Sequence, residues 1–132
     1  MLHVYRRFEF CRDVIILVSK KTPKKYLDYL NDRHYDYIIA GQDYVDYKEA
    51  FLSLQENYLV RTILADIGKT LGNILLNRHL ADEISLLIHP SIAGIKTLNL
   101  FSGVESCLNL KLLKLEVLNN DYIWVSYKVG YP

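Results

Sequence analysis

Four short polar segments follow the predicted strands of this chain and contain most of its candidate ligand-binding residues: residues 19–21, 41–43, 66–70 and 89–94. In parallel α/β sheets, ligands bind outside the carboxyl ends of the strands, so these segments share the favoured position. The segment 66–70 is the most informative, because a glycine turn there leads directly into a predicted helix. Free N–H groups and the helix dipole attract anions at such a helix start.

A basic cluster follows the first predicted strand, where Lys20 and Lys21 are joined by Lys24 and Lys25. One interpretation is a solvated helix start with no ligand. The other is a site for a phosphate group, such as the 2′-phosphate of NADPH, because ammonium groups near a strand end hold phosphate oxygens well. The sequence alone leaves both interpretations open.

Several common chemistries find no support in the sequence. A nucleotide-hydrolase phosphate loop needs a glycine five positions before Gly68, and Ile63 stands there. A classical dinucleotide fold would need Gly-x-Gly-x-x-Gly, which is missing. The neighbours Asp82 and Glu83 are expected to be structural, because adjacent strand residues point to opposite faces. We also predict no metal site and no disulfide, because the histidines and cysteines show no ligand or redox spacing: His3, His34, His79, His89, Cys11 and Cys107.

Length and composition describe a single ordinary globular domain. The 132 residues are 51% apolar and 23% charged, which excludes disorder for most of the chain. Sixteen basic and fifteen acidic residues give a net charge of +1, so nothing global indicates a nucleic-acid or membrane-surface binder. No apolar run approaches the roughly 20 residues of a membrane span. We therefore expect a cytoplasmic protein.

The elements that would position these segments alternate in type. Apolar runs predict strands at residues 14–18, 37–40, 62–65 and 83–89. Helices are predicted from Thr22-Pro23 to about residue 34 with Tyr26, Leu27 and Leu30 inward, from 46 to 57 with Ala50, Phe51 and Leu54 inward, and over 71–80 with Leu71, Ile74, Leu75 and Leu80 inward. Asp46 and Glu49 have the form of a capping box. Three crossovers in succession predict a mostly parallel sheet. Alternating runs at 110–118 and 122–129 around Asn119-Asn120-Asp121 predict a C-terminal antiparallel hairpin.

The segment 66–94, DIGKTLGNILLNRHLADEISLLIHPSIAG, closely resembles the signature of the riboflavin-biosynthesis pyrimidine reductases. These form the reductase domain of a bifunctional bacterial deaminase–reductase and stand alone in archaea. The resemblance implies an α/β, dihydrofolate-reductase-like mixed sheet, here as a single, N-terminally truncated reductase domain over residues 1–132. It also implies NADPH as cofactor and hydride transfer to C1′ of a phosphorylated ribosylamino-pyrimidine, which turns its ribosyl ring into a ribityl chain.

The resemblance implies roles for particular residues. The cofactor diphosphate would lie on the turn and helix start formed by Gly68, Lys69, Thr70, Leu71, Gly72, Asn73 and Ile74. Ser19 and Lys20 would lie near the adenosine phosphate, Ala40 and Gly41 would let the cofactor approach the backbone, and Asp66 would face the substrate. Catalytic residues stay unassigned.

Two further expectations follow from the resemblance. Open strand edges, and dimerisation among relatives, predict a homodimer. Ile67 and Lys69 stand where the family pattern has serine and glycine. This difference favours the alternative of a non-catalytic relative that keeps the fold as a cofactor-binding or structural domain.

Overall fold

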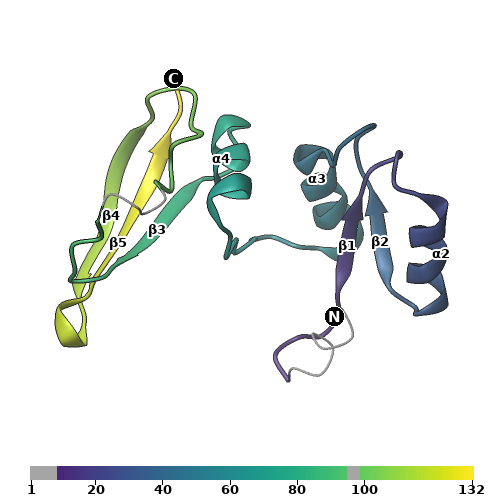
Figure 1. Ribbon diagram of the computed structural model, residues 1–132, viewed down its shortest axis with the longest axis horizontal. Coiled ribbons are helices and arrows are strands. Elements are labelled where there is room, and N and C mark those ends of the chain that lie inside the picture. Colours follow the sequence, from purple (N-terminus) through teal and green to yellow (C-terminus); the bar gives the residue numbers. More distant parts are fainter. Residues whose placement is uncertain (1–8, 95–98) are drawn as a thin grey trace. The chain divides into compact units, whose positions relative to one another are not determined.

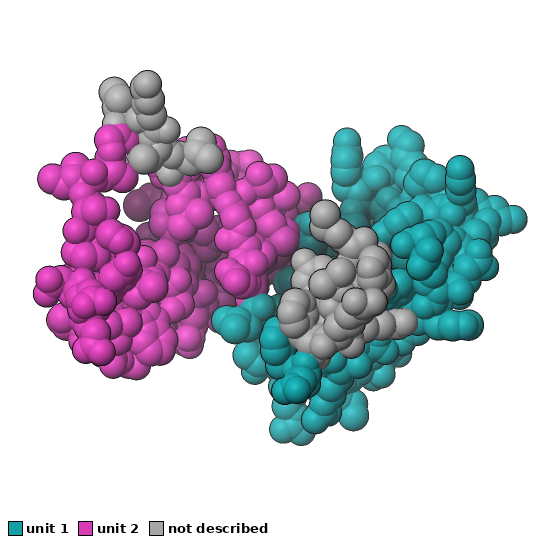
Figure 2. Space-filling model, turned by 60° about the horizontal axis from the view of Figure 1, so that its bottom comes forward, with its two compact units in different colours: residues 1–64 teal, residues 65–132 magenta. Residues whose placement is uncertain are grey.

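The computed structural model describes residues 9–94 and 99–132 and consists of two compact units (Figures 1 and 2). The first unit is Met1–Leu64 and the second is Ala65–Pro132. In the part of the chain that the structure describes, no helix is long and apolar enough to cross a membrane.

The first unit is a β–α–β crossover followed by a helix. Its elements are β1 (Ile15–Val18), α2 (Lys24–Asp32), β2 (Asp36–Ile39) and α3 (Tyr47–Tyr58). The strands pair in parallel, in a register that runs from Ile15 opposite Asp36 to Val18 opposite Ile39. The two predicted strands and the crossover between them are therefore confirmed.

Two apolar clusters form the core of this unit, and each contains the residues that one face of the sheet contributes. Val18, Leu30 and Tyr35 form one cluster, with Ile16 and Leu27 packed against it. Ile38, Ala40 and Ala50 form the other, with Ile15, Leu17 and Leu54 packed against it. Successive strand side chains point to opposite faces, so α2 covers one face of the sheet and α3 covers the other. This arrangement explains why residues 14–18 are apolar without alternation.

The start of α3 follows the predicted capping box only in part. Asp46 is the N-cap, and its carboxylate accepts hydrogen bonds from the N–H groups of Lys48 (2.9 Å) and Glu49 (3.1 Å). The Glu49 carboxylate does not reach back to Asp46 and instead accepts from the Gly41 N–H at 2.7 Å. The Asp46 N–H is already used, because it donates to Ala40 O at 3.2 Å.

Helix α2 differs from the prediction at its start and on its outer face. Pro23 is its N-cap, and Thr22 does not cap it. The Thr22 hydroxyl instead accepts from the Ser19 N–H at 3.1 Å. Tyr26 was expected to face inward, but it is exposed and its ring stacks on Tyr29.

The second unit packs one helix with a three-stranded antiparallel sheet. Its elements are α4 (Lys69–Asn77), β3 (Glu83–Ile88), β4 (Asn109–Val117), the 3₁₀ turn η1 (Asn119–Asp121) and β5 (Ile123–Gly130). The strand order is β3-β5-β4, with a register shift in β4 between Leu112 and Lys114. The predicted hairpin is confirmed as β4 and β5. Among the described residues of this unit, the buried apolar side chains are Leu75, Leu76, Val125 and Val129.

Two predictions about the sheet are wrong. Residues 62–65 form no strand, and β3 pairs antiparallel with β5 rather than joining a parallel sheet. Over residues 9–94 and 99–132, the first unit has a two-stranded parallel sheet and the second unit has a three-stranded antiparallel sheet, so a mostly parallel sheet is not observed. Strand propensity alone does not make a strand, because each N–H and C=O needs a partner on a neighbouring chain segment.

Helix α4 begins two residues before the predicted start and ends three residues before the predicted end. Its buried residues are Asn73, Leu75 and Leu76, whereas Ile74 is 37% exposed and was wrongly placed inward. His79 follows with φ of 55°, a left-handed conformation that ends the helix before residue 80.

Candidate functional site

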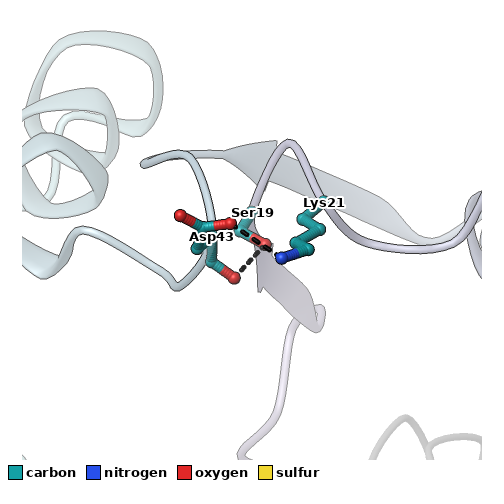
Figure 3. Close-up of polar contacts among 3 residues, drawn as sticks. All are labelled: Ser19, Lys21 and Asp43. Atoms are coloured by element: carbon teal, nitrogen blue, oxygen red, sulfur yellow. Dashed lines mark hydrogen bonds and ion pairs between the residues drawn. The ribbon is translucent and has the colours of Figure 1, made fainter.

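The loops after β1 and β2 run side by side, because backbone hydrogen bonds join them beyond the strands. The Lys20 N–H donates to Gly41 O at 3.1 Å, and the Lys21 N–H donates to Gln42 O at 3.0 Å. Figure 3 shows two side-chain contacts at the same place. The Ser19 hydroxyl donates to Asp43 O at 3.2 Å, and Lys21 Nζ lies 3.0 Å from Asp43 Oδ1.

Ser19 and Ala40 have their polar groups occupied within the fold. Ser19 is buried, and its N–H, C=O and hydroxyl are all bonded, the first two to Thr22. Ala40 is fully buried; its N–H donates to Val18 O, and its C=O accepts from the Asp46 N–H. Ser19 and Ala40 therefore hold the loops after β1 and β2 in place, and the residues that follow them in these loops form the outer surface.

Gly41 makes the turn between these residues possible. Its φ is 80°, which L side chains rarely adopt. A Cβ at this position would overlap Tyr44 O and lie 2.7 Å from Asp46 N. The fold itself thus demands glycine here, and the position explains how the loop after β2 reaches Lys21.

The start of α4 presents unpaired donors. Gly68 is the N-cap with extended backbone, and no side chain caps the helix. The first N–H groups of an α-helix have no partner within it. Within the described residues, no other hydrogen bond takes up the N–H groups of Lys69, Thr70 and Leu71. A Cβ at Gly68 would meet nothing within 4 Å, so this helix start is open to an anion.

A cavity of about 160 Å³ lies in the second unit beside this helix start. Its lining is mostly apolar, and Asn73, Glu83 and Ser85 supply the polar side chains. The full lining consists of Ala65, Ile67, Gly68, Gly72, Asn73, Leu75, Leu76, Ala81, Glu83, Ile84, Ser85, Leu86, Leu100 and Phe101. An apolar cavity of about 150 Å³ holds one benzene ring. This cavity therefore has room for a single ring, not for a whole dinucleotide.

The predicted residues of the 66–74 segment differ in their surroundings. Gly68, Gly72 and Asn73 line the cavity, whereas Asp66 is exposed and is not among the lining residues. Asn73 is 6% exposed, and its Oδ1 has no hydrogen-bond partner among the residues that the structure describes. Lys69 is half-buried and is the first residue of α4.

Asn77 and Asp43 are two polar residues whose contacts the sequence interpretation missed: Asn77 had no role in it, and Asp43 was included only as part of the segment 41–43. Asn77 donates from Nδ2 to Gly103 O at 2.8 Å and accepts at Oδ1 from the Glu105 N–H at 3.0 Å. It thereby fixes the segment that carries the cavity residues Leu100 and Phe101. No sequence signal points to Asn77. Asp43 could have been found, because it is an acidic residue in a loop with lysines across from it.

The histidines, cysteines and Asp82 make ordinary contacts where the structure describes them. His79 stacks on Tyr131, and His89 Nδ1 lies 2.9 Å from Ser91 Oγ. Asp82 O accepts from the Val129 N–H. Cys11 and Cys107 are free thiols, and His3 lies outside the described residues. Over residues 9–94 and 99–132, no group of three or more such side chains could hold a metal ion.

Comparison with known proteins gives one family and several structural relatives. The model of the RibD C-terminal domain matches residues 6–124. A pyrimidine reductase-like protein from Corynebacterium diphtheriae superposes with a TM-score of 0.76 at 22% identity, covering 89% of this chain. Two structures of RibD from Acinetobacter baumannii, forms 1 and 2, give TM-scores of 0.67 and 0.66 at 18% identity, covering 87% and 86% of this chain.

The chain spans half of the length of the Corynebacterium protein and 31% of each RibD chain. At these identities the similarity shows a shared fold. No curated protein matches the chain.

Proposed function

This chain belongs to the RibD C-terminal domain family, and we propose that it is an NADPH-dependent reductase of riboflavin biosynthesis. Its substrate would be a phosphorylated ribosylamino-pyrimidine, whose ribosyl ring is reduced to a ribityl chain. The family match extends across both compact units. We therefore infer that residues 1–132 belong to one reductase domain.

The observation that carries this proposal is the open start of α4. Three N–H donors there have no partner among the described residues, and Gly68 leaves the approach to them free. Such a donor set fits the diphosphate of a dinucleotide, because the N–H groups and the helix dipole both favour negative charge. The ammonium group of Lys69 adds a positive charge at the same helix start.

The bound cofactor would supply the hydride, and this chain would supply binding and orientation. In this proposal residues 68–74 hold the diphosphate. Ser19, Ala40 and Gly41 shape the loops after β1 and β2, because the hydrogen bonds of Ser19 and Ala40 and the turn at Gly41 hold these loops in place. Asp66 is exposed and would face the substrate. Holding two ligands in a reactive geometry accounts for a large share of the rate in such reactions.

Calorimetric titration of this chain with NADPH, and with NADH for comparison, tests the proposal. We expect saturable binding of NADPH at micromolar concentration. Gly68→Trp should abolish it by filling the space before the helix start, whereas Leu52→Trp, at an exposed position of α3, should leave it unchanged. NADPH binding that is the same in the Gly68→Trp variant would remove the placement of this site.

A second candidate is a non-catalytic relative that binds the cofactor without turnover. Ile67 favours it, because this residue lines the cavity with an apolar side chain where the family pattern has serine. Titration with NADPH, followed by an assay for oxidation of NADPH with the pyrimidine substrate, separates the two. Binding with no oxidation supports the second candidate.

We also propose a homodimer. Strand β4 forms an edge of its sheet, and its side chains Leu115 and Val117 are 62% and 72% exposed. Open edges with apolar side chains favour pairing with another chain. Sedimentation velocity should give twice the mass of 15.4 kDa; a monomer at all concentrations would exclude the dimer.

A further inference from the structure

The cavity of the second unit has a buried polar side chain without a partner in its wall. Asn73 of α4 lines the cavity and is 6% exposed, and its Oδ1 accepts no hydrogen bond within residues 9–94 and 99–132. A buried carbonyl oxygen without a hydrogen bond costs free energy, so such atoms are uncommon in folded proteins. A molecule inside the cavity that donates a hydrogen bond to this oxygen would remove that cost.

The other polar side chains of the wall are exposed or engaged elsewhere. Glu83 and Ser85 are both exposed. The Ser85 hydroxyl accepts a hydrogen bond from Trp124 Nε1 at 2.7 Å and lies 3.5 Å from Ser126 Oγ. The remaining lining residues are glycines or have apolar side chains. The wall therefore offers an occupant apolar surface together with one buried hydrogen-bonding group.

The volume and the lining of the cavity favour one kind of occupant. Its volume of about 160 Å³ is close to the about 150 Å³ of a cavity that holds one benzene ring. A buried water molecule usually needs about two to four polar partners, and the buried wall supplies one side chain of this kind. Apolar walls also disfavour an ion, because its lost hydration is not replaced. A neutral ring with one donor group fits the cavity best.

This cavity lies along the side of α4, next to its open start. The free N–H groups of that start belong to Lys69, Thr70 and Leu71, and none of these three residues is part of the cavity lining in the described structure. Gly68 borders both places. An anion on the free N–H groups would therefore leave the space beside Asn73 unfilled.

We propose that this cavity binds a small, neutral aromatic ring with one O–H or N–H donor, of the phenol class, and that the donor bonds to Asn73 Oδ1. The inference goes beyond the proposed reductase function and does not depend on it. All of the lining residues belong to the second unit, so the site is complete within that unit. A half-turn of the Asn73 carboxamide exchanges its oxygen and its NH₂ group, so the oxygen can face the ring while α4 stays in place.

Titration of the full chain with phenol and with benzene, followed by NMR of the amide groups, tests the proposal. Benzene is the same ring without a donor. We expect both rings to bind at about 1 mM, as is reasonable for so few atoms, and to shift the amide signals of lining residues such as Leu76 and Phe101. Asn73→Leu keeps the size of the side chain and removes its polar atoms. It should lower the ratio of phenol affinity to benzene affinity about fivefold, which corresponds to one net hydrogen bond.

Two further variants test the location. Gly72→Leu should abolish the binding of both rings, because Gly72 lines the cavity and a Cβ there meets only Ile67 Cδ1, at 3.9 Å. The leucine side chain then fills the space. Asn57→Leu is the matched control for Asn73→Leu, because it makes the same change at an exposed position of α3 in the first unit. It should leave both affinities unchanged. Circular dichroism checks that each variant is folded.

Several outcomes would overturn the inference. One is the absence of signal shifts at the cavity residues with either ring. Another is a phenol-to-benzene ratio that stays within about twofold in Asn73→Leu. If that variant does not fold, the Asn73 side-chain NH₂ signals of the original chain decide, because phenol should shift them more than benzene does.

A last arm uses NADPH as competitor and separates the inference from the proposed function. Phenol that NADPH displaces would make the cavity part of the cofactor site and overturn the inference. Phenol that binds equally with and without saturating NADPH supports a separate site. Phenol binding by a chain that does not bind NADPH removes the proposed function and leaves this inference standing.

Discussion

Gly103 lies against Asn73 so closely that even a methyl group should destabilise the fold. A Cβ at Gly103 would lie 2.6 Å from Asn73 Nδ2, 3.2 Å from its Cγ and 3.3 Å from its Cβ. Asn73 is 6% exposed and stands on α4, so its side chain has little room to move away. Gly103 does not need a left-handed backbone, so the effect of an alanine comes from this contact alone.

The expected magnitude for Gly103→Ala follows from two opposing terms. Overpacking a buried contact costs about 1–3 kcal/mol of unfolding free energy. Replacing glycine at an unstrained position recovers about 0.4–1 kcal/mol, because the unfolded chain loses freedom. We therefore expect Gly103→Ala to lower the unfolding free energy by about 1–2 kcal/mol. Urea denaturation followed by Trp124 fluorescence measures this change.

Asn73→Ala provides the decisive second background. It removes Nδ2 and Cγ, the two nearest atoms that Gly103→Ala would meet, and leaves the Cβ at 3.3 Å. It also removes the buried Oδ1, which has no partner among the described residues. In this background Gly103→Ala should be neutral or stabilising by up to about 1 kcal/mol. The double-mutant cycle should thus give a coupling energy above about 1 kcal/mol.

Additive effects in the cycle would refute the reasoning, because they would mean that the two side chains do not meet. Gly68→Ala is the control for adding a methyl group near α4. Its Cβ would meet nothing within 4 Å, so its unfolding free energy should stay within about 0.5 kcal/mol of the original.

Three further predictions concern the stability of single elements. Leu59 ends α3 with φ of 56° and is 81% exposed, so Leu59→Asn should raise the unfolding free energy in urea by about 1 kcal/mol; a loss would contradict the strain. Asp46→Ala should lower it by about 1 kcal/mol, whereas Asp46→Asn should keep most of the cap. Burial, with Asp82 nearby, raises the pKa of Tyr131 above its ordinary 10.0 despite its hydrogen bond to Ala81. The folded state then holds this proton more tightly, so the contribution of Tyr131 to the unfolding free energy should be constant below pH 10 and decrease above pH 10. Tyr131→Phe should make this decrease smaller in alkaline denaturation curves.

The fold could be predicted best where the pattern of neighbouring residues also determines how the element packs. The run at residues 14–18 indicates a strand buried on both faces, and α2 and α3 do cover the two faces of β1 and β2. The Asn119-Asp121 turn similarly predicts the hairpin of β4 and β5. In both cases the residues that define the element also supply its partner or its cover, so little depends on distant parts of the chain.

The prediction fails where an element depends on a partner. Residues 62–65 have the composition of a strand, yet Leu64 is 93% exposed and the segment pairs with nothing in the described structure. The direction of β3 was misjudged for a related reason. Its apolar run allows either a parallel or an antiparallel neighbour, and the position of β5 decides between them.

Lys69 illustrates the same limit for the candidate site. The family pattern has glycine at this position, and a lysine would be costly there if the backbone needed a positive φ. Lys69 instead begins α4 and is not among the residues with positive φ, so its side chain carries no such penalty. What the position requires is an open approach to the helix N–H groups, and Gly68 leaves that approach open. Lys69→Gly should therefore weaken NADPH binding in the calorimetric titration, through the loss of an ammonium group and a less stable first helical turn. Tighter binding by Lys69→Gly would show instead that the lysine side chain obstructs the diphosphate.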